Sequence, residues 1–155
     1  MIALVQRVAE AKVTVGGETV GAIGRGILAL IGVERGDSEA EAERLVQKII
    51  SFRMFEDDAG KMNRSLTDIG GELLAVPQFT LAADTNSGTR ASFSAAAAPP
   101  DAERLFSYLV QILKPKSRVA TGVFGADMKV SLVNDGPVTF WLQVAPQSSS
   151  LQNKS

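Results

Sequence analysis

The chain of 155 residues contains no histidine and no cysteine. Without histidine it lacks the usual general base, the triads of acyl-transfer enzymes and the commonest metal ligand. Without cysteine it forms no disulfide, no thiolate nucleophile and no sulfur-ligated metal site, which fits a cytoplasmic protein. Any chemistry must therefore come from carboxylates, hydroxyls, lysines, backbone groups or the substrate, and we expect no metal and no other cofactor.

Long apolar runs and a strong net charge are also absent. No apolar run reaches the roughly 18 residues that suggest a membrane span, and the strand-like opening Met1–Arg7 lacks the design of a signal peptide. A net charge of −1 gives no general attraction for nucleic acid, so a polyanion would need a local patch. With 45% hydrophobic and 21% charged residues, the sequence predicts one globular domain, residues 1–145, followed by a polar, disordered tail, 146–155.

Turn and capping signals predict an α/β fold. Gly16-Gly17 separates two alternating runs, as in a β-hairpin. The continuous apolar run 27–33 predicts a strand buried on both faces. Ser38 and Glu41 are spaced as a capping box at the start of a helix, and the segment 99–101, Pro-Pro-Asp, starts a second one. The elements together predict a mixed sheet with two main helices.

One irregularity interrupts the C-terminal part of the sheet. The stretch 127–144 reads as one long buried strand, but Asn134-Asp135-Gly136-Pro137 divides it into strands at 127–133 and 138–144. Proline donates no ladder hydrogen bond, and glycine takes backbone angles closed to other residues. Main-chain carbonyls can therefore be turned out of the sheet and aimed at a ligand, although the same residues also suit a plain turn. Further strands are expected at 53–55, 72–76 and 117–120.

Two segments together resemble one family, the D-aminoacyl-tRNA deacylases. They are Gln78-Phe79-Thr80-Leu81 and Asn134-Asp135-Gly136-Pro137-Val138-Thr139, and the likeness extends over residues 1–144. The resemblance implies a homodimer with curved layers of β-sheet. It also implies hydrolysis of the ester that joins a D-amino acid, or mischarged glycine, to the terminal adenosine of tRNA, a proofreading step in translation.

The resemblance also implies roles for individual residues. The Gly136-Pro137 bond would be cis and would reach into the pocket of the partner subunit, and Arg7 would steady that loop. The residues alone also allow plainer roles: Thr80 as an ordinary strand residue, Phe79 and Phe124 as core aromatics, and Arg7 as a solvated edge residue. The catalytic positions implied are Gln78, Phe79 and Thr80, and the substrate-binding positions are Arg7, Pro77, Phe124, Met128, Gly136 and Pro137.

Pro77 departs from the family pattern, which has serine there. The exchange removes a hydroxyl and a backbone N–H donor. A related animal enzyme that clears L-alanine from mischarged tRNA is similar at Pro77-Gln78 but has alanine where Phe79 stands. Two alternatives to a D-specific deacylase therefore remain open: a proofreader of L-alanyl-tRNA, and a noncatalytic dimer that binds tRNA or amino acids.

The two motifs suggest a division of labour. Carbonyls of Gly136 and Pro137 can accept hydrogen bonds from the substrate ammonium, worth roughly 1.5–3 kcal/mol each. An L side chain would then strike these carbonyls, whereas a D side chain would point away. Backbone N–H groups of Phe79 and Thr80 can stabilise the oxyanion if the chain turns there. We favour attack by water, aided by the 2′-hydroxyl of the adenosine, over attack by Thr80, for which no activating base is evident.

A basic cluster follows the second predicted helix. Lys114, Lys116 and Arg118 are its members. They suit contacts with tRNA phosphates, but they equally suit the solvated end of a helix.

Overall fold

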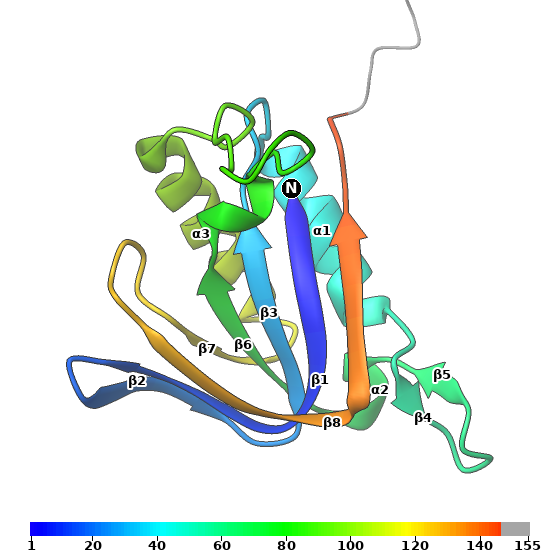
Figure 1. Ribbon diagram of the computed structural model, residues 1–155. Helices are drawn as coiled ribbons and strands as arrows, with labels where there is room; N and C mark the ends of the chain where they lie inside the picture. Colours follow the sequence, from blue (N-terminus) through cyan, green and yellow to red (C-terminus); the bar gives the residue numbers. More distant parts are fainter. Residues whose placement is uncertain (147–155) are drawn as a thin grey trace, which may run out of the picture.

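The sheet is built around one long strand, β1 (Ile2–Val15), in the computed structural model, which describes residues 1–146 (Figure 1). Its first half pairs antiparallel with β3 (Gly26–Gly32), and its second half with β2 (Glu18–Ile23). Along its other edge β1 pairs with β8 (Lys129–Gln143). The hairpin predicted at Gly16-Gly17 is confirmed, and both glycines have positive φ angles, 57° and 82°.

Parallel strands complete the sheet. β3, β6 (Glu72–Pro77) and β7 (Arg118–Thr121) pair in parallel, so the sheet is mixed, with the order β2-β1-β3-β6-β7 and β8 on β1. The helices α1 (Glu39–Ser51) and α3 (Pro99–Leu113) lie in the crossovers and pack against each other on one side of the sheet (Figure 1). The predicted mixed sheet with two main helices is confirmed. β3 is buried at every position except Leu30, as its apolar run indicated.

Apolar stripes on the two helices form the core with the sheet. Residues three and four apart share one face of a helix, and these positions are apolar and buried in both. The core also encloses Met54 and Phe55, both fully buried in the segment after α1. The buried apolar residues of the helices are Ala42, Leu45, Val46, Ile49 and Ile50 in α1, and Ala102, Leu105, Phe106, Leu109, Val110 and Leu113 in α3.

Short elements close one end of the sheet. β4 (Phe55–Glu56) and β5 (Met62–Arg64) form a two-stranded hairpin, and α2 (Leu66–Ile69) follows it. The strand expected at 53–55 is therefore displaced, since only Phe55 lies in β4. The strand expected at 117–120 is present one residue later, as β7.

The expectation of a long buried strand near the C-terminus was wrong. The two expected strands are joined in β8, and Leu142 is its only buried residue. Val133 and Trp141 are about half exposed, at 51% and 52%. The cause is position, because within residues 1–146 β8 pairs with β1 alone and is an edge strand of the sheet. An apolar sequence predicts burial only where a second layer covers it.

The described residues reach just past the predicted domain boundary. The disordered tail expected at 146–155 lies outside the described residues, apart from Pro146. Within residues 1–146, no helix is long and apolar enough to cross a membrane.

The capping box predicted at the start of α1 is present. The Glu41 carboxylate accepts hydrogen bonds from the backbone N–H of Ser38, at 2.7 Å, and from its hydroxyl. These bonds, with the Ser38 hydroxyl as the largest cause, lower the pKa of Glu41 below its usual 4.5. A carboxyl whose pKa is lowered by folding stabilises the fold above its unfolded pKa, and this contribution is lost as pH falls through the folded pKa.

We expect Ser38→Ala to lower the free energy of unfolding by about 1 kcal/mol at pH 7, because it removes a capping interaction. The deficit should shrink as pH falls through the lowered pKa of Glu41 in the folded parent protein, because the protonated carboxyl no longer accepts these bonds. Urea denaturation across this range measures it. Ser51→Ala, at the other end of the same helix, is the control, since the Ser51 hydroxyl bonds only the Gln47 carbonyl. A deficit that does not change with pH would contradict the link to Glu41.

Candidate active site

The Gly-Pro loop, residues 134–138, is an outward bulge of β8. The strand pairs Gln6–Thr139 and Val8–Asn134 leave one residue of β1, Arg7, opposite four residues of β8. Gly136 has a φ of 143°, and the Gly136-Pro137 peptide bond is cis. Both residues are exposed. The interruption seen in the sequence is therefore a projecting loop within one continuous strand.

Asn134 closes the base of this loop. Its side-chain Oδ1 accepts from the Val138 N–H at 2.9 Å, and its Nδ2 donates to the Thr139 hydroxyl at 3.0 Å. Gln6 on β1 donates to the same hydroxyl at 3.3 Å. We did not predict this role, although asparagine side chains are well known to bond the backbone of turns.

Arg7 holds the loop from beneath. It is only 7% exposed, although it is charged. Its Nε donates to the Asp135 carbonyl at 2.9 Å, and its Nη1 donates to the Met54 carbonyl at 3.0 Å. The carboxylates of Glu56 and Asp135 lie 3.9 Å from the guanidinium. Arg7 is therefore a buried tie between the loop and the core, not a solvated edge residue.

The second motif forms a turn. After Pro77 ends β6, the Gln78 N–H bonds the Ile31 carbonyl at 2.7 Å, and the 3₁₀ helix η1 (Phe79–Ala82) begins. The first helical bond runs from the Leu81 N–H to the Gln78 carbonyl at 3.3 Å. The N–H groups of Phe79 and Thr80 precede it and so have no partner within the helix.

Thr80 is not a strand residue. It lies in η1 and is exposed, and its Oγ1 accepts a hydrogen bond from the Gln78 side-chain amide. An amide NH₂ group donates hydrogen bonds and takes up no proton, so Gln78 orients the hydroxyl without activating it.

Pro77 fits its strand without loss of a ladder bond. The Gln78 N–H faces β3, and successive N–H groups of a strand face opposite neighbours, so the Pro77 nitrogen faces β7. Pairing with β7 has already ended there, at Ala75 with Thr121. The absent donor therefore costs the sheet nothing.

An apolar pocket of about 530 Å³ opens beside η1. Phe79, 59% exposed, and Phe93 meet across it with ring centroids 5.3 Å apart. Pro77 and Phe124 line it as well, so three positions expected at the site come together here. Met128 adjoins them through Gly122: a Cβ at that glycine would lie 2.7 Å from the Met128 sulfur and 3.6 Å from the Pro77 ring. The apolar pocket is lined by Arg35, Pro77, Phe79, Phe93, Ala96, Ala97, Ala98, Pro99, Ala102, Phe124 and Gly125.

The structure does not bring the two motifs together within one chain. Arg7, beneath the Gly-Pro loop, pairs with Ile27, whereas Gln78 bonds Ile31 at the other end of β3. Four residues of a strand span about 13 Å. In Figure 1 the bend of β8 lies at the lower end of the sheet and η1 beyond the upper end of β6.

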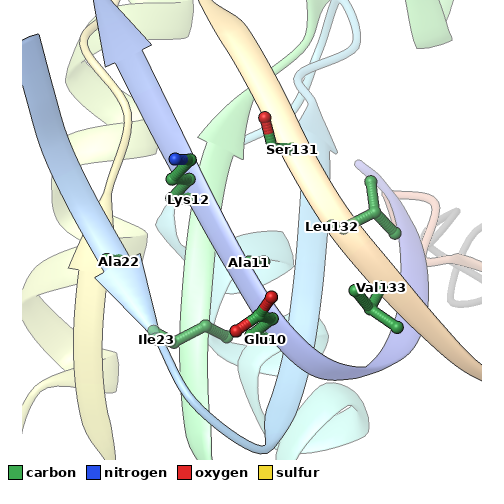
Figure 2. Close-up of a pocket in the computed structure, with 8 residues that line it drawn as sticks. All are labelled: Glu10, Ala11, Lys12, Ala22, Ile23, Ser131, Leu132 and Val133. Atoms are coloured by element: carbon green, nitrogen blue, oxygen red, sulfur yellow. The ribbon is translucent and has the colours of Figure 1, made fainter.

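A second hollow, of about 280 Å³, lies on β1, β2 and β8 (Figure 2). Glu10, Lys12 and Ser131 are its polar residues, and Ile23, Leu132 and Val133 are apolar. No sequence motif indicated it, and it contains none of the expected site residues. Among residues 1–146, no group of acidic side chains is placed to hold a metal ion.

Comparison with known proteins identifies the fold and the family. Residues 4–143 match the family model described as D-Tyr-tRNA(Tyr) deacylase. The D-aminoacyl-tRNA deacylase of Thioalkalivibrio sulfidiphilus is 65% identical over 147 residues, 94% of this chain and 99% of the relative. The solved structure of the c-Myc DNA Unwinding Element Binding Protein is 41% identical with a TM-score of 0.89, covering 94% of this chain and all of that one (100%).

A more distant structure shares the fold. A probable eukaryotic D-amino acid tRNA deacylase superposes with a TM-score of 0.73 at 17% identity, covering 92% of this chain and 98% of its own. The class is thus a small α/β domain with the fold of the tRNA deacylases. The chain belongs to the D-Tyr-tRNA(Tyr) deacylase family.

The tie made by Arg7 is testable through stability. We expect Arg7→Lys to lower the free energy of unfolding by about 1–3 kcal/mol, because one ammonium cannot serve the Asp135 and Met54 carbonyls together. Urea denaturation measures the loss. Arg44→Lys is the matched control, since Arg44 also donates to a backbone carbonyl, that of Ala145, but at the surface. Equal effects of the two substitutions would contradict a special role for the buried arginine.

Proposed function

We propose that this protein is a D-aminoacyl-tRNA deacylase acting in the cytoplasm, which frees tRNA from D-amino acids and from mischarged glycine. Membership of the deacylase family supports this function. The observation that carries the proposal is the turn at Phe79–Thr80, which presents two N–H groups without a partner in η1 at the edge of an apolar pocket. Such a pair suits the oxyanion that develops as an ester is cleaved.

The terminal adenosine of tRNA occupies the apolar pocket. Its volume and its three phenylalanine rings suit a nucleobase, which proteins commonly hold by stacking on aromatic side chains. The ester carbonyl then lies at η1, where the Phe79 and Thr80 N–H groups receive its oxygen. Only the orientation of an already activated ester and the stabilisation of its oxyanion are then required.

A water molecule attacks the ester carbon. Its oxygen bonds to that carbon, the bond to the ribose oxygen breaks, and a proton passes to the ribose oxygen, so a free amino acid and intact tRNA result. The neighbouring 2′-hydroxyl of the adenosine assists the proton transfer. Thr80 positions the substrate, because its hydroxyl is bonded to an amide that cannot act as a base.

Chirality is selected by the Gly-Pro loop of a second subunit. The two motifs lie at opposite ends of the sheet of one chain, whereas Gly136 and Pro137 project freely and can reach another molecule. The exposed apolar residues of β8, Leu132, Val133 and Trp141, support a homodimer that covers this strand. Carbonyls of the loop bind the substrate ammonium and exclude L side chains.

Pro77 supports one alternative, a proofreader of L-alanyl-tRNA. The exposed Phe79 ring at the mouth of the pocket favours the D-specific function. The related L-alanine enzyme resembles this chain at Pro77 but has alanine in place of Phe79.

The function is tested by deacylation of matched substrates. We expect the purified protein to release amino acid from D-tyrosyl-tRNA and glycyl-tRNA, but not from L-tyrosyl-tRNA or L-alanyl-tRNA, because side-chain direction decides entry. Thr80→Ala should retain substantial activity. Release from L-alanyl-tRNA alone would identify the alternative proofreader, and no release from any substrate would indicate a noncatalytic binder. An inactive but folded Thr80→Ala would restore threonine as the nucleophile.

The shared site is tested by mixing two inactive variants. Phe79→Pro removes one oxyanion N–H at the first helical position, where proline is tolerated, and should cost about 10²–10³ in kcat. Phe79→Ala is its control, because it keeps the N–H. Gly136→Ala disturbs the loop, since an added Cβ would lie 2.6 Å from a Val138 methyl at a positive φ. It should abolish release from D-tyrosyl-tRNA along with selectivity, because the displaced carbonyls no longer bind the substrate ammonium.

Mixed dimers of these two variants distinguish the arrangements. If each site combines η1 of one chain with the loop of the other, a mixed dimer has one intact site, and equal mixing after unfolding and refolding restores about a quarter of the parent activity. If each chain carried a whole site, every site would contain one defect and no activity would return. Circular dichroism of each variant confirms that both fold.

A further inference from the structure

A groove continues from the apolar pocket along α3. It has a volume of about 360 Å³ and runs between α3 and the segment that follows β7, and we call it the α3–β7 groove. Phe124 lines both the pocket and the groove, so the two hollows meet at this ring. Ala102 lines the pocket end and Lys114 lines the groove beyond the last turn of α3.

The length of this path suits a short run of nucleotides. A helix rises 1.5 Å per residue, so Ala102 and Lys114 lie about 18 Å apart along α3. Stacked nucleotides advance about 3.4 Å each along a strand. A chain whose last base fills the apolar pocket therefore has room for several preceding nucleotides in the groove.

The chemistry of the groove suits a sugar–phosphate chain. Ser107, Gln111 and Thr121 supply polar groups along it. Lys114 is exposed at its far end, and Lys116 is exposed nearby. Among residues 1–146, neither lysine forms an ion pair, whereas Arg118 lies 3.6 Å from the Glu72 carboxylate. Of the basic cluster seen in the sequence, the two lysines are thus available for phosphates.

One lining residue has the opposite charge. Glu103 is exposed and lines the groove, and no ion pair or hydrogen bond of its carboxylate is present within residues 1–146. Next to a phosphate chain, this carboxylate opposes binding. Lys114 and Glu103 should therefore change affinity in opposite directions when their charges are removed.

We propose that the α3–β7 groove binds the single-stranded nucleotides that precede the terminal adenosine of tRNA, with Lys114 contacting a phosphate. This inference rests on the proposed function, since it continues from the adenosine placed in the apolar pocket. Proteins that hold single strands combine basic grooves with aromatic platforms, and Phe124 and Lys114 supply both elements here. The contacts are with the backbone of the strand, so they are independent of the amino acid attached.

Two substrates distinguish the groove from the catalytic pocket. D-tyrosyl-tRNA fills both, whereas the D-tyrosyl ester of adenosine has no phosphates and fills only the pocket. We expect Lys114→Ala to lower kcat/KM roughly 3- to 10-fold on the tRNA at low salt and to leave the adenosine ester unchanged. Glu103→Gln should raise kcat/KM on the tRNA alone. Lys61→Ala, on the β4–β5 hairpin away from α3 in Figure 1, is the control for loss of one positive charge.

Binding of uncharged tRNA supplies a readout that is independent of hydrolysis. We expect Lys114→Ala to reduce the slope of log affinity against log salt concentration by about 0.7, the value for one phosphate contact on a single strand. An unchanged slope, an effect equal to that of Lys61→Ala, or an equal loss on both ester substrates would overturn the proposal. Failure of the proposed deacylase function is distinguishable from failure of the groove proposal. In the first case the parent protein would cleave neither ester, while the measurement of tRNA binding would still report on the groove.

Discussion

The antiparallel pairing of β1 with β8 is the constraint on which the rest of the structure depends. It holds both halves of β1 against one outer strand. Within it, the single residue Arg7 lies opposite the four residues 135–138, and this mismatch forces Gly136 and Pro137 outward. The guanidinium of Arg7 fills the space left behind and bonds two backbone carbonyls. A buried charge is tolerated there because two of its nitrogens donate to backbone carbonyls and two carboxylates lie 3.9 Å away.

The same pairing separates the two motifs. Since β1 holds the Gly-Pro loop at one end of β3 and η1 follows the other end of the neighbouring strand β6, one chain cannot place them on one ligand. One chain therefore leaves the apolar residues of β8 exposed and the proposed substrate site at η1 without a Gly-Pro loop. A second subunit would cover the former and supply the loop to the latter, which makes assembly a part of the proposed catalytic site and not an addition to it.

Local signals predicted local structure well. The Gly16-Gly17 hairpin and the bonding of Ser38 to Glu41 each involve residues close in sequence, so residue type and spacing decide them. Burial of β8 was predicted wrongly because it depends on which elements cover a strand, and an apolar pattern is silent about that. The grouping of Phe93 with Phe79 is likewise a tertiary contact, made by a loop and a turn that no periodicity connects.

The recognition surface that we propose for the Gly-Pro loop has a consequence for how this protein can evolve. In the proposed mechanism the recognising atoms are main-chain oxygens, which every amino acid carries, so no exchange of a side chain can delete or replace them. The position of Gly136 is also closed to other residues, because its φ of 143° and the nearby Val138 methyl exclude a Cβ. A point mutation therefore has little means to change gradually which enantiomer the protein accepts. It either leaves the proposed selectivity intact or abolishes it.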